Sequence, residues 1–185
     1  GDYNNFFGSL AGYAYDTNNS TATGDHNNIF GGYSKSSGSN NDHENVFGGG
    51  LTGKGANTTF IKGAVYNSNN SSSFSTTSDE RIKKNIVDNN TGLDAIEKIR
   101  VRNFEYRTKN EITDFDNPEA VVVEDKEGVQ LGVIAQEIKD ILPDVVKQNT
   151  TGAYAVNPDN LTWYLVNAVK ELSAEVKSLK AQLNS

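Results

Sequence analysis

Apolar residues in the first third of the chain occur mostly as isolated pairs that are followed by glycine. Residues 25–32 (DHNNIFGG) recur as residues 42–49 (DHENVFGG), and residues 4–8 and 57–61 are weaker copies. An apolar pair before glycine is typical of a brief strand that turns a corner. A repeat so poor in apolar residues cannot bury a face alone. It therefore predicts stacking of successive repeats, and of several chains around an axis.

We expect residues 1–66 to form an all-β, trimeric shaft segment, as a β-prism or β-helix in which one phenylalanine per repeat and chain meets at the axis. The segment 1–77 holds 13 of the 17 glycines and is rich in Asn, Ser and Thr, which without the repeat would indicate disorder. Disorder is therefore the alternative to an ordered shaft. Residues 67–77 are almost entirely Ser, Asn and Thr and predict an exposed linker, a favourable place for proteolysis.

From residue 78 onward ordinary secondary structure becomes readable, and we expect an α+β domain over residues 78–185 that ends in a long helix. Short apolar runs bounded by turn residues locate its elements. The expected elements are a helix at Leu93, Ile96 and Ile99, a strand over 101–106, a hairpin of 121–123 with 130–133, a helix over 134–142 ended by Pro143, and a hairpin of 145–146 with 153–156.

The terminal segment, residues 159–183, carries the clearest helical pattern of the chain. Its apolar residues alternate spacings of four and three, which is the a/d pattern of a coiled coil. Packing of the helix on its own domain is the alternative to self-association. The expected trimer seam consists of Leu165, Val169, Leu172, Val176, Leu179 and Leu183.

Composition narrows the range of partners. The net charge of −7 argues against nucleic acid and anionic membranes. No apolar run is long enough for a transmembrane helix, and Gly1 in place of methionine, without a leader pattern, suggests a fragment or a processed chain. The absence of cysteine excludes disulfides and thiolate metal sites. We expect no cofactor and no metal.

Ser78 and Lys83 stand at the boundary between the two halves and admit two interpretations. Thr77-Ser78-Asp79-Glu80 fits a capping box, which would make Ser78 part of a helix start. Alternatively Ser78 is a nucleophile and Lys83 its general base, provided that the lysine is neutral. Five residues place two side chains about 140° apart on a helix, and on opposite faces of a strand. The pair therefore needs a turn, or a lysine from another chain.

Three ordered motifs resemble the C-terminal intramolecular chaperone domain of phage endosialidases, tail fibres and neck appendages. The first runs from Ser78-Asp79-x-Arg81-x-Lys83 to Ile86. The second is residues 132–137 (GVIAQE), followed by Leu-Pro at 142–143 and Val-Val at 145–146. The third is residues 168–172 (AVKEL), with valine where the family has isoleucine. The resemblance covers residues 78–185.

This resemblance implies a domain that trimerises, assists folding of the shaft before it, and then releases itself by a single self-cleavage. Carried over by residue, Ser78 is the nucleophile, Lys83 the base and Thr77–Ser78 the scissile bond, whereas Asp79 and Arg81 orient or support the motif. The implied partners are a homotrimer and the upstream shaft as folding client. The implied locations are the virion tail fibre for the shaft and the host cytoplasm for the released chaperone.

Other functions remain as alternatives. The chain could instead be an uncleaved trimeric fibre foot or a receptor-binding fibre tip. A third alternative is the self-cleaving segment of a membrane-tethered transcription factor. The absence of a transmembrane helix and the polar repeats disfavour this third alternative. Tyr13, Tyr15 and Tyr33 are weak indications of a host surface glycan. His26 and His43 occupy equivalent repeat positions and would hold an ion only on a threefold axis; polar repeat positions are the simpler interpretation.

Overall fold

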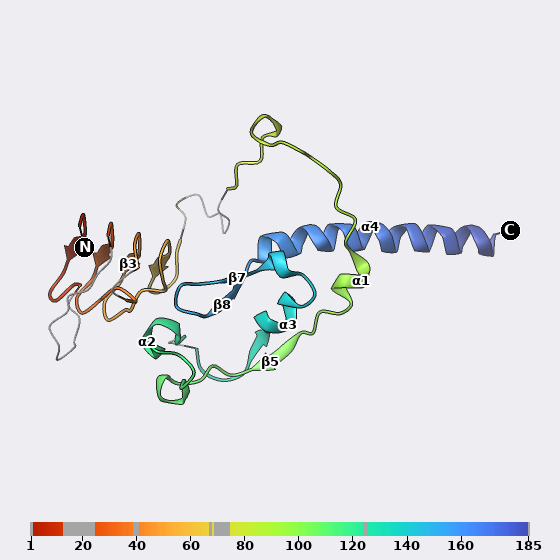
Figure 1. The fold of residues 1–185 in the computed structure, drawn as a ribbon. Coiled ribbons are helices and arrows are strands. Elements are labelled where there is room, and N and C mark those ends of the chain that lie inside the picture. The colour runs from red at the N-terminus through yellow and green to blue at the C-terminus, as the bar shows by residue number, and fades with distance from the viewer. Residues whose placement is uncertain are drawn as a thin grey trace.

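The computed structural model describes residues 2–12, 25–38, 41–66, 68, 75–123 and 126–184. A repeat segment (residues 2–66) stands at one end, and a C-terminal domain (residues 92–184) lies beside it and extends into a long projecting helix (Figure 1). A connecting segment (residues 75–91) arches between them. The predicted mixed class is confirmed in its coarser form: small sheets are combined with short helices and one long C-terminal helix.

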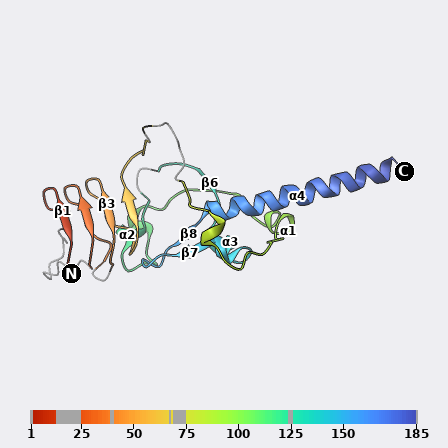
Figure 2. The same ribbon diagram turned by 90° about the horizontal axis from the view of Figure 1, so that it is seen from above.

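The repeat segment forms one parallel ladder of four short strands. These are β1 (Asn5–Phe7), β2 (Asn28–Phe30), β3 (Asn45–Phe47) and β4 (Thr59–Ile61), hydrogen-bonded in that order. Each strand comes from one of the four repeat copies, and the register pairs equivalent positions, such as Ile29 with Val46. Figure 2 shows the strands side by side. The prediction of one brief strand per repeat is therefore confirmed, and for these described residues disorder is wrong.

Alternation along each strand separates an inner row of side chains from outer rows. Ile29 and Val46 point inward and are fully buried, with Leu51 packed against them. Outside, the rings of Phe7, Phe30 and Phe47 stack with centroids 5.0 and 5.1 Å apart. These phenylalanines contact one another along a single chain; a meeting of chains at an axis stays a prediction.

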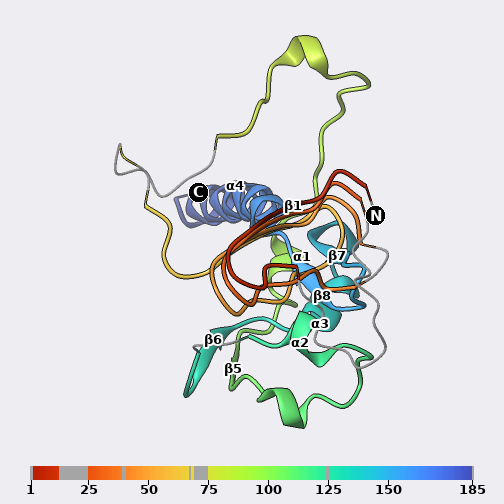
Figure 3. The same cartoon turned by 90° about the vertical axis from the view of Figure 1, so that its left-hand side faces the viewer.

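The corners of the ladder repeat as regularly as its strands. Tyr3, His26, His43 and Asn57 each precede a strand and adopt left-handed backbone angles, with φ of 58–59°. After the strands, Gly31 has a φ of 144°, and a Cβ atom there would lie 2.1 Å from the carbonyl oxygen of Gly48. The glycines that follow Phe7, Phe30 and Phe47 thus let neighbouring coils approach closely. Viewed from this end, the coils lie one behind another (Figure 3).

The rest of the chain alternates short helical turns with two antiparallel strand pairs. β5 pairs with β6, and β7 pairs with β8. The elements in chain order are η1 (Glu80–Ile82), α1 (Leu93–Ile96), β5 (Arg102–Phe104), η2 (Lys109–Glu111), α2 (Pro118–Val121), β6 (Gln130–Gly132), α3 (Ala135–Lys139), η3 (Pro143–Val145), β7 (Val146–Gln148), β8 (Tyr154–Val156) and α4 (Pro158–Leu183).

Most predicted elements are found, but the first hairpin was predicted with the wrong partner. Strand β6 pairs with β5, not with residues 121–123. Val121 instead ends α2, because Pro118 at the first helical position favours a helical turn there. The burial of Ala120 and Val122 stabilises this turn. The second hairpin, the helix after Ile134 and the terminal helix are confirmed.

The core of the C-terminal domain brings the sequence motifs together. Ile138, Leu142 and Val145 are almost completely buried and pack with Ala95 of α1. Helix α4 crosses α1 at Ala168, where a Cβ on Gly92 would lie 2.8 Å from the backbone nitrogen of Ala168. The second and third motifs therefore contain residues that hold α1, α3 and α4 against one another.

Charged side chains reinforce this core at its edge. Glu137 of the second motif accepts hydrogen bonds from Nε and Nη2 of Arg102 at 3.2 and 2.5 Å. This pairing lowers the pKa of Glu137 and raises that of Arg102. It joins α3 to β5, so the glutamate of the motif has a structural role.

Helix α4 is 26 residues long, and its outer half extends beyond the domain body. In the described part of the chain, no helix combines the length and apolar character needed to span a bilayer.

Candidate functional site

The first motif forms a single 3₁₀ turn on the connecting segment. Asp79 is the N-cap of η1, and its Oδ1 accepts a hydrogen bond from the backbone N–H of Arg81 at 2.8 Å. The N–H of Lys83 closes the turn on the carbonyl of Glu80 at 3.0 Å, after which the chain is extended. Asp79 rather than Ser78 therefore caps this turn, and the capping-box interpretation of Ser78 is wrong.

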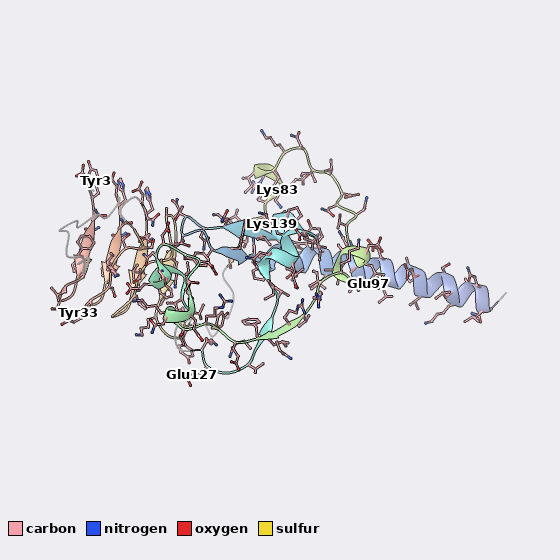
Figure 4. All side chains as sticks on the ribbon, turned by 60° about the horizontal axis from the view of Figure 1, so that its bottom comes forward. Tyr3, Tyr33, Lys83, Glu97, Glu127 and Lys139 are labelled. Carbon is pink, nitrogen blue, oxygen red and sulfur yellow. The ribbon has the colours of Figure 1, made fainter. Side chains whose placement is uncertain are left out.

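The turn brings the side chains of Ser78 and Lys83 together. Lys83 Nζ donates a hydrogen bond to Ser78 Oγ at 2.6 Å. The five-residue spacing would separate these groups in a regular helix or strand, and a turn was one of the two predicted solutions. In the structure, the turn brings them together within one chain. Figure 4 labels Lys83 on the arching segment, away from the ladder.

An arrangement of hydroxyl and amine at this distance can transfer a proton between them. A serine hydroxyl becomes a good nucleophile only when a base removes its proton, and an amine serves as that base only when it is neutral. Burial and nearby cations favour the neutral amine. In the single chain, every residue from 75 to 91 is exposed. The distance between Ser78 Oγ and Lys83 Nζ thus suits proton transfer, but the single chain leaves both side chains exposed to solvent.

Asp79 and Arg81 form a bidentate ion pair within the same turn. Asp79 Oδ1 accepts from Arg81 Nε at 2.9 Å, and Oδ2 accepts from Arg81 NH2 at 2.7 Å. The guanidinium lowers the pKa of Asp79, and the carboxylate raises that of Arg81. Both side chains thus hydrogen-bond to each other within the turn. The arrangement agrees with the expected orienting role, which stays a prediction.

The predicted trimer seam lies on an open face of α4. Ala168 and Tyr164 turn toward the domain, whereas the seam residues lie along another face. Their exposed fractions run from 41% to 85%, and the members are Leu165, Val169, Leu172, Val176, Leu179 and Leu183. Helix α4 thus packs on its own domain through Ala168 and Tyr164, as the alternative interpretation expected, while this stripe stays open in the single chain; self-association through the stripe stays a prediction.

The remaining candidates lie on the ladder. The rings of His26 and His43 stack at 4.9 Å, and Tyr3 stacks on His26 at 5.0 Å, so both histidines are surface repeat positions. Within the described residues, no group of three His, Cys, Asp or Glu side chains is placed to hold a metal. Tyr33 is 70% exposed at a corner. Tyr13 and Tyr15 lie outside the described residues.

One charged cluster was missed from the sequence, at the contact between the ladder and α2. Glu119 pairs with Lys35 of the repeat segment and with Lys109 of η2. A weak signal was available, since Lys35, Lys54 and Lys62, the lysines of the repeat segment, all fall in its later coils.

Comparison with known protein families identifies the segment that begins at the Ser78–Lys83 turn. Residues 78–147 match the family Peptidase_S74, described as chaperone of endosialidase. This match contains the first two motifs, confirms the resemblance over residues 78–147 and supports an endosialidase-type chaperone function, whereas the third motif lies beyond the matched residues. Comparison with curated proteins gave no match.

Proposed function

We propose, on the premise that residues 78–147 belong to an endosialidase-type chaperone domain, that this domain trimerises a phage tail-fibre or appendage shaft and then cleaves itself from it. The observation that carries the proposal is the 2.6 Å contact between Lys83 Nζ and Ser78 Oγ at the first residues of the matched segment. The cut lies between Thr77 and Ser78. The shaft remains in the virion, and the chaperone is released in the host cytoplasm.

The cleavage proceeds through an ester within the chain. Neutral Lys83 accepts the Ser78 hydroxyl proton, and Oγ attacks the carbonyl carbon of Thr77. The peptide C–N bond breaks, and the Ser78 nitrogen takes up a proton, which completes an N-to-O acyl shift. Water then hydrolyses the ester. The products are a Thr77 carboxylate and a Ser78 amino terminus, so one water is consumed and each domain reacts once.

In this proposal, assembly into a trimer supplies the burial that Ser78 and Lys83 lack in the single chain. The pair is exposed to water in one chain. In the proposed trimer, a neighbouring subunit would cover the connecting segment and exclude water from Lys83. Cleavage would then depend on assembly, and an unassembled chain would keep its chaperone.

A trimerising chaperone also suits the repeat segment. A parallel strand ladder depends on contacts between distant residues, which makes its nucleation slow. Coils of similar sequence can also pair out of register. Joining three chains at one end raises their effective concentration and aligns them before the coils close.

N-terminal sequencing of the purified chain tests the cleavage. We expect wild type to yield two fragments on a denaturing gel, the second beginning at Ser78. Ser78→Ala and Lys83→Ala should remain intact. Lys84→Ala removes the neighbouring exposed lysine and should cleave as wild type does.

An intact wild-type chain under native, trimeric conditions would contradict self-cleavage. It would leave the alternative of an uncleaved fibre foot. Cleavage that persists in Ser78→Ala would show that another group breaks the bond.

A further inference from the structure

The C-terminal domain is attached to the repeat segment in two independent ways. One is the covalent path through the connecting segment, whose residues are all exposed and which contains the Thr77–Ser78 bond. The other is a direct contact between the last coils of the ladder and the part of the domain that contains α2 and the β7–β8 turn. Cutting the first link removes none of the contacts of the second.

Helix α2 supplies the polar half of this contact. Asn117 Nδ2 donates to the carbonyl of Ser37 at 2.6 Å, and Glu119 Oε2 pairs with Lys35 Nζ at 2.5 Å. Lys54 Nζ reaches across to the carbonyl of Val122 at 2.7 Å. These three interactions bridge the two parts, two through backbone carbonyls and one through an ion pair.

The β7–β8 turn supplies a second point of contact. Thr150 Oγ1 accepts a hydrogen bond from the backbone N–H of Ala56 at 2.8 Å. The fit there is close, because a Cβ on Gly55 would lie 2.6 Å from the same oxygen. Ala120 and Val122 on the domain, and Leu51 on the ladder, are each less than 8% exposed.

The contact requires a folded last coil. Glu44 is completely buried and accepts hydrogen bonds from the N–H groups of Ser37 and Gly55 at 3.0 and 2.7 Å. These two residues flank the points that Asn117 and Thr150 touch. An unfolded repeat segment would not present the Ser37 carbonyl, Lys35 and the Ala56 N–H in this arrangement.

We propose that α2 and the β7–β8 turn form a client-docking surface, which recognises the folded end of the ladder and retains the domain there after the connecting segment is cut. Cleavage and release are then separate steps, and release requires the Asn117, Glu119 and Thr150 contacts to break. For the natural cut, this inference rests on the proposed self-cleavage.

The test cuts the chain with an added protease, so its outcome does not depend on self-cleavage. A recognition sequence for a site-specific protease is inserted between residues 70 and 71 of the full chain carrying Ser78→Ala, and the added protease cuts it completely. Size-exclusion chromatography and native mass spectrometry at low ionic strength then follow the two fragments. We expect them to remain together.

The docking variant is Asn117→Ala with Glu119→Ala, and its control is Glu127→Ala, which removes an exposed carboxylate outside the contact. Circular dichroism before the cut checks that both variants fold. We expect the nicked docking variant to dissociate at least tenfold faster than the nicked control. Immediate separation of the otherwise unsubstituted nicked chain, or equal dissociation rates for the two variants, would overturn the inference. Failure of wild type to cleave itself would refute only the proposed function.

Discussion

At the scale of residues, a buried carboxylate organises the end of the ladder, and its partners among the described residues are hydroxyl and backbone N–H groups. Glu44 takes the position that asparagine holds in the preceding coil, and both of its oxygens accept hydrogen bonds. The donors are hydroxyl and backbone N–H groups of Ser36, Ser37 and Gly55. A buried carboxylate is tolerated where donors satisfy it, so one substitution in the repeat fixes two neighbouring loops.

Replacing this carboxylate should destabilise the repeat segment. Glu44→Ala leaves the N–H groups of Ser37 and Gly55 without their acceptor, and we expect the free energy of unfolding to fall by about 3 kcal/mol or more. Glu44→Gln keeps the shape and one acceptor oxygen, so its loss should be smaller. Denaturant unfolding of the Ser78→Ala chain measures both. Equal stability of Glu44→Ala and the parent would contradict this role.

At the scale of elements, a local sequence pattern was enough to predict the ladder strands and α4. The prediction failed at residues 121–123, whose conformation depends on tertiary contacts. Strands of the ladder follow from the repeat, and α4 from its apolar spacing. Residues 121–123 are all valine, which favours a strand. Their conformation depends instead on Pro118 and on burial of Val122 beside the ladder, 68 residues from its contact Lys54. No local pattern reports such a contact.

The same distinction applies to the candidate site. The Ser78–Lys83 pair was predicted because both residues lie in one motif, and its need for a turn followed from spacing. The docking contact was not predicted, because Lys35 and Glu119 lie in different parts of the chain and each alone looks like an ordinary surface charge.

The open stripe of α4 should control association. Leu172→Asp places a charge in the middle of the predicted seam, where Leu172 is 51% exposed in the single chain. We expect this variant to be monomeric by analytical ultracentrifugation and to retain its connecting bond. Ser178→Asp, which adds the same charge elsewhere on the helix, should remain trimeric. A trimeric Leu172→Asp, or a wild type that is itself monomeric, would contradict the seam.

At the scale of the whole molecule, retention of the cut domain should depend on acid pH. The hydrogen bonds from Lys109 and Lys35 lower the pKa of Glu119 to about 2 from its ordinary 4.5. Lys109 on η2 and Lys35 on the ladder are the charged groups that pair with Glu119. Lys109 stays beside Glu119 on the separated domain, so only the part of the lowering that Lys35 causes links ionisation to docking. Because that part lowers the pKa in the docked state, its stabilisation is present at neutral pH and is lost at acid pH, as the pH falls toward about 2.

We therefore expect the nicked complex to dissociate faster as the pH falls from 5 to 3, with circular dichroism confirming that both parts stay folded. Glu119→Gln cannot ionise, so its complex should dissociate faster at pH 5 and show a flatter dependence on pH. A wild-type profile that matches that of Glu119→Gln would exclude Glu119 as the titrating group.

The coils of the ladder keep their register although they differ in length. Side chains paired from β1 to β2, from β2 to β3 and from β3 to β4 are 23, 17 and 14 residues apart in sequence. Each strand is three residues long, so the difference in coil length falls entirely on the segments between the strands. Each coil contributes one strand spacing of about 4.8 Å to the ladder. Gain or loss of a whole coil would change the reach of this segment in equal steps, while its inner and outer rows of side chains keep their pattern.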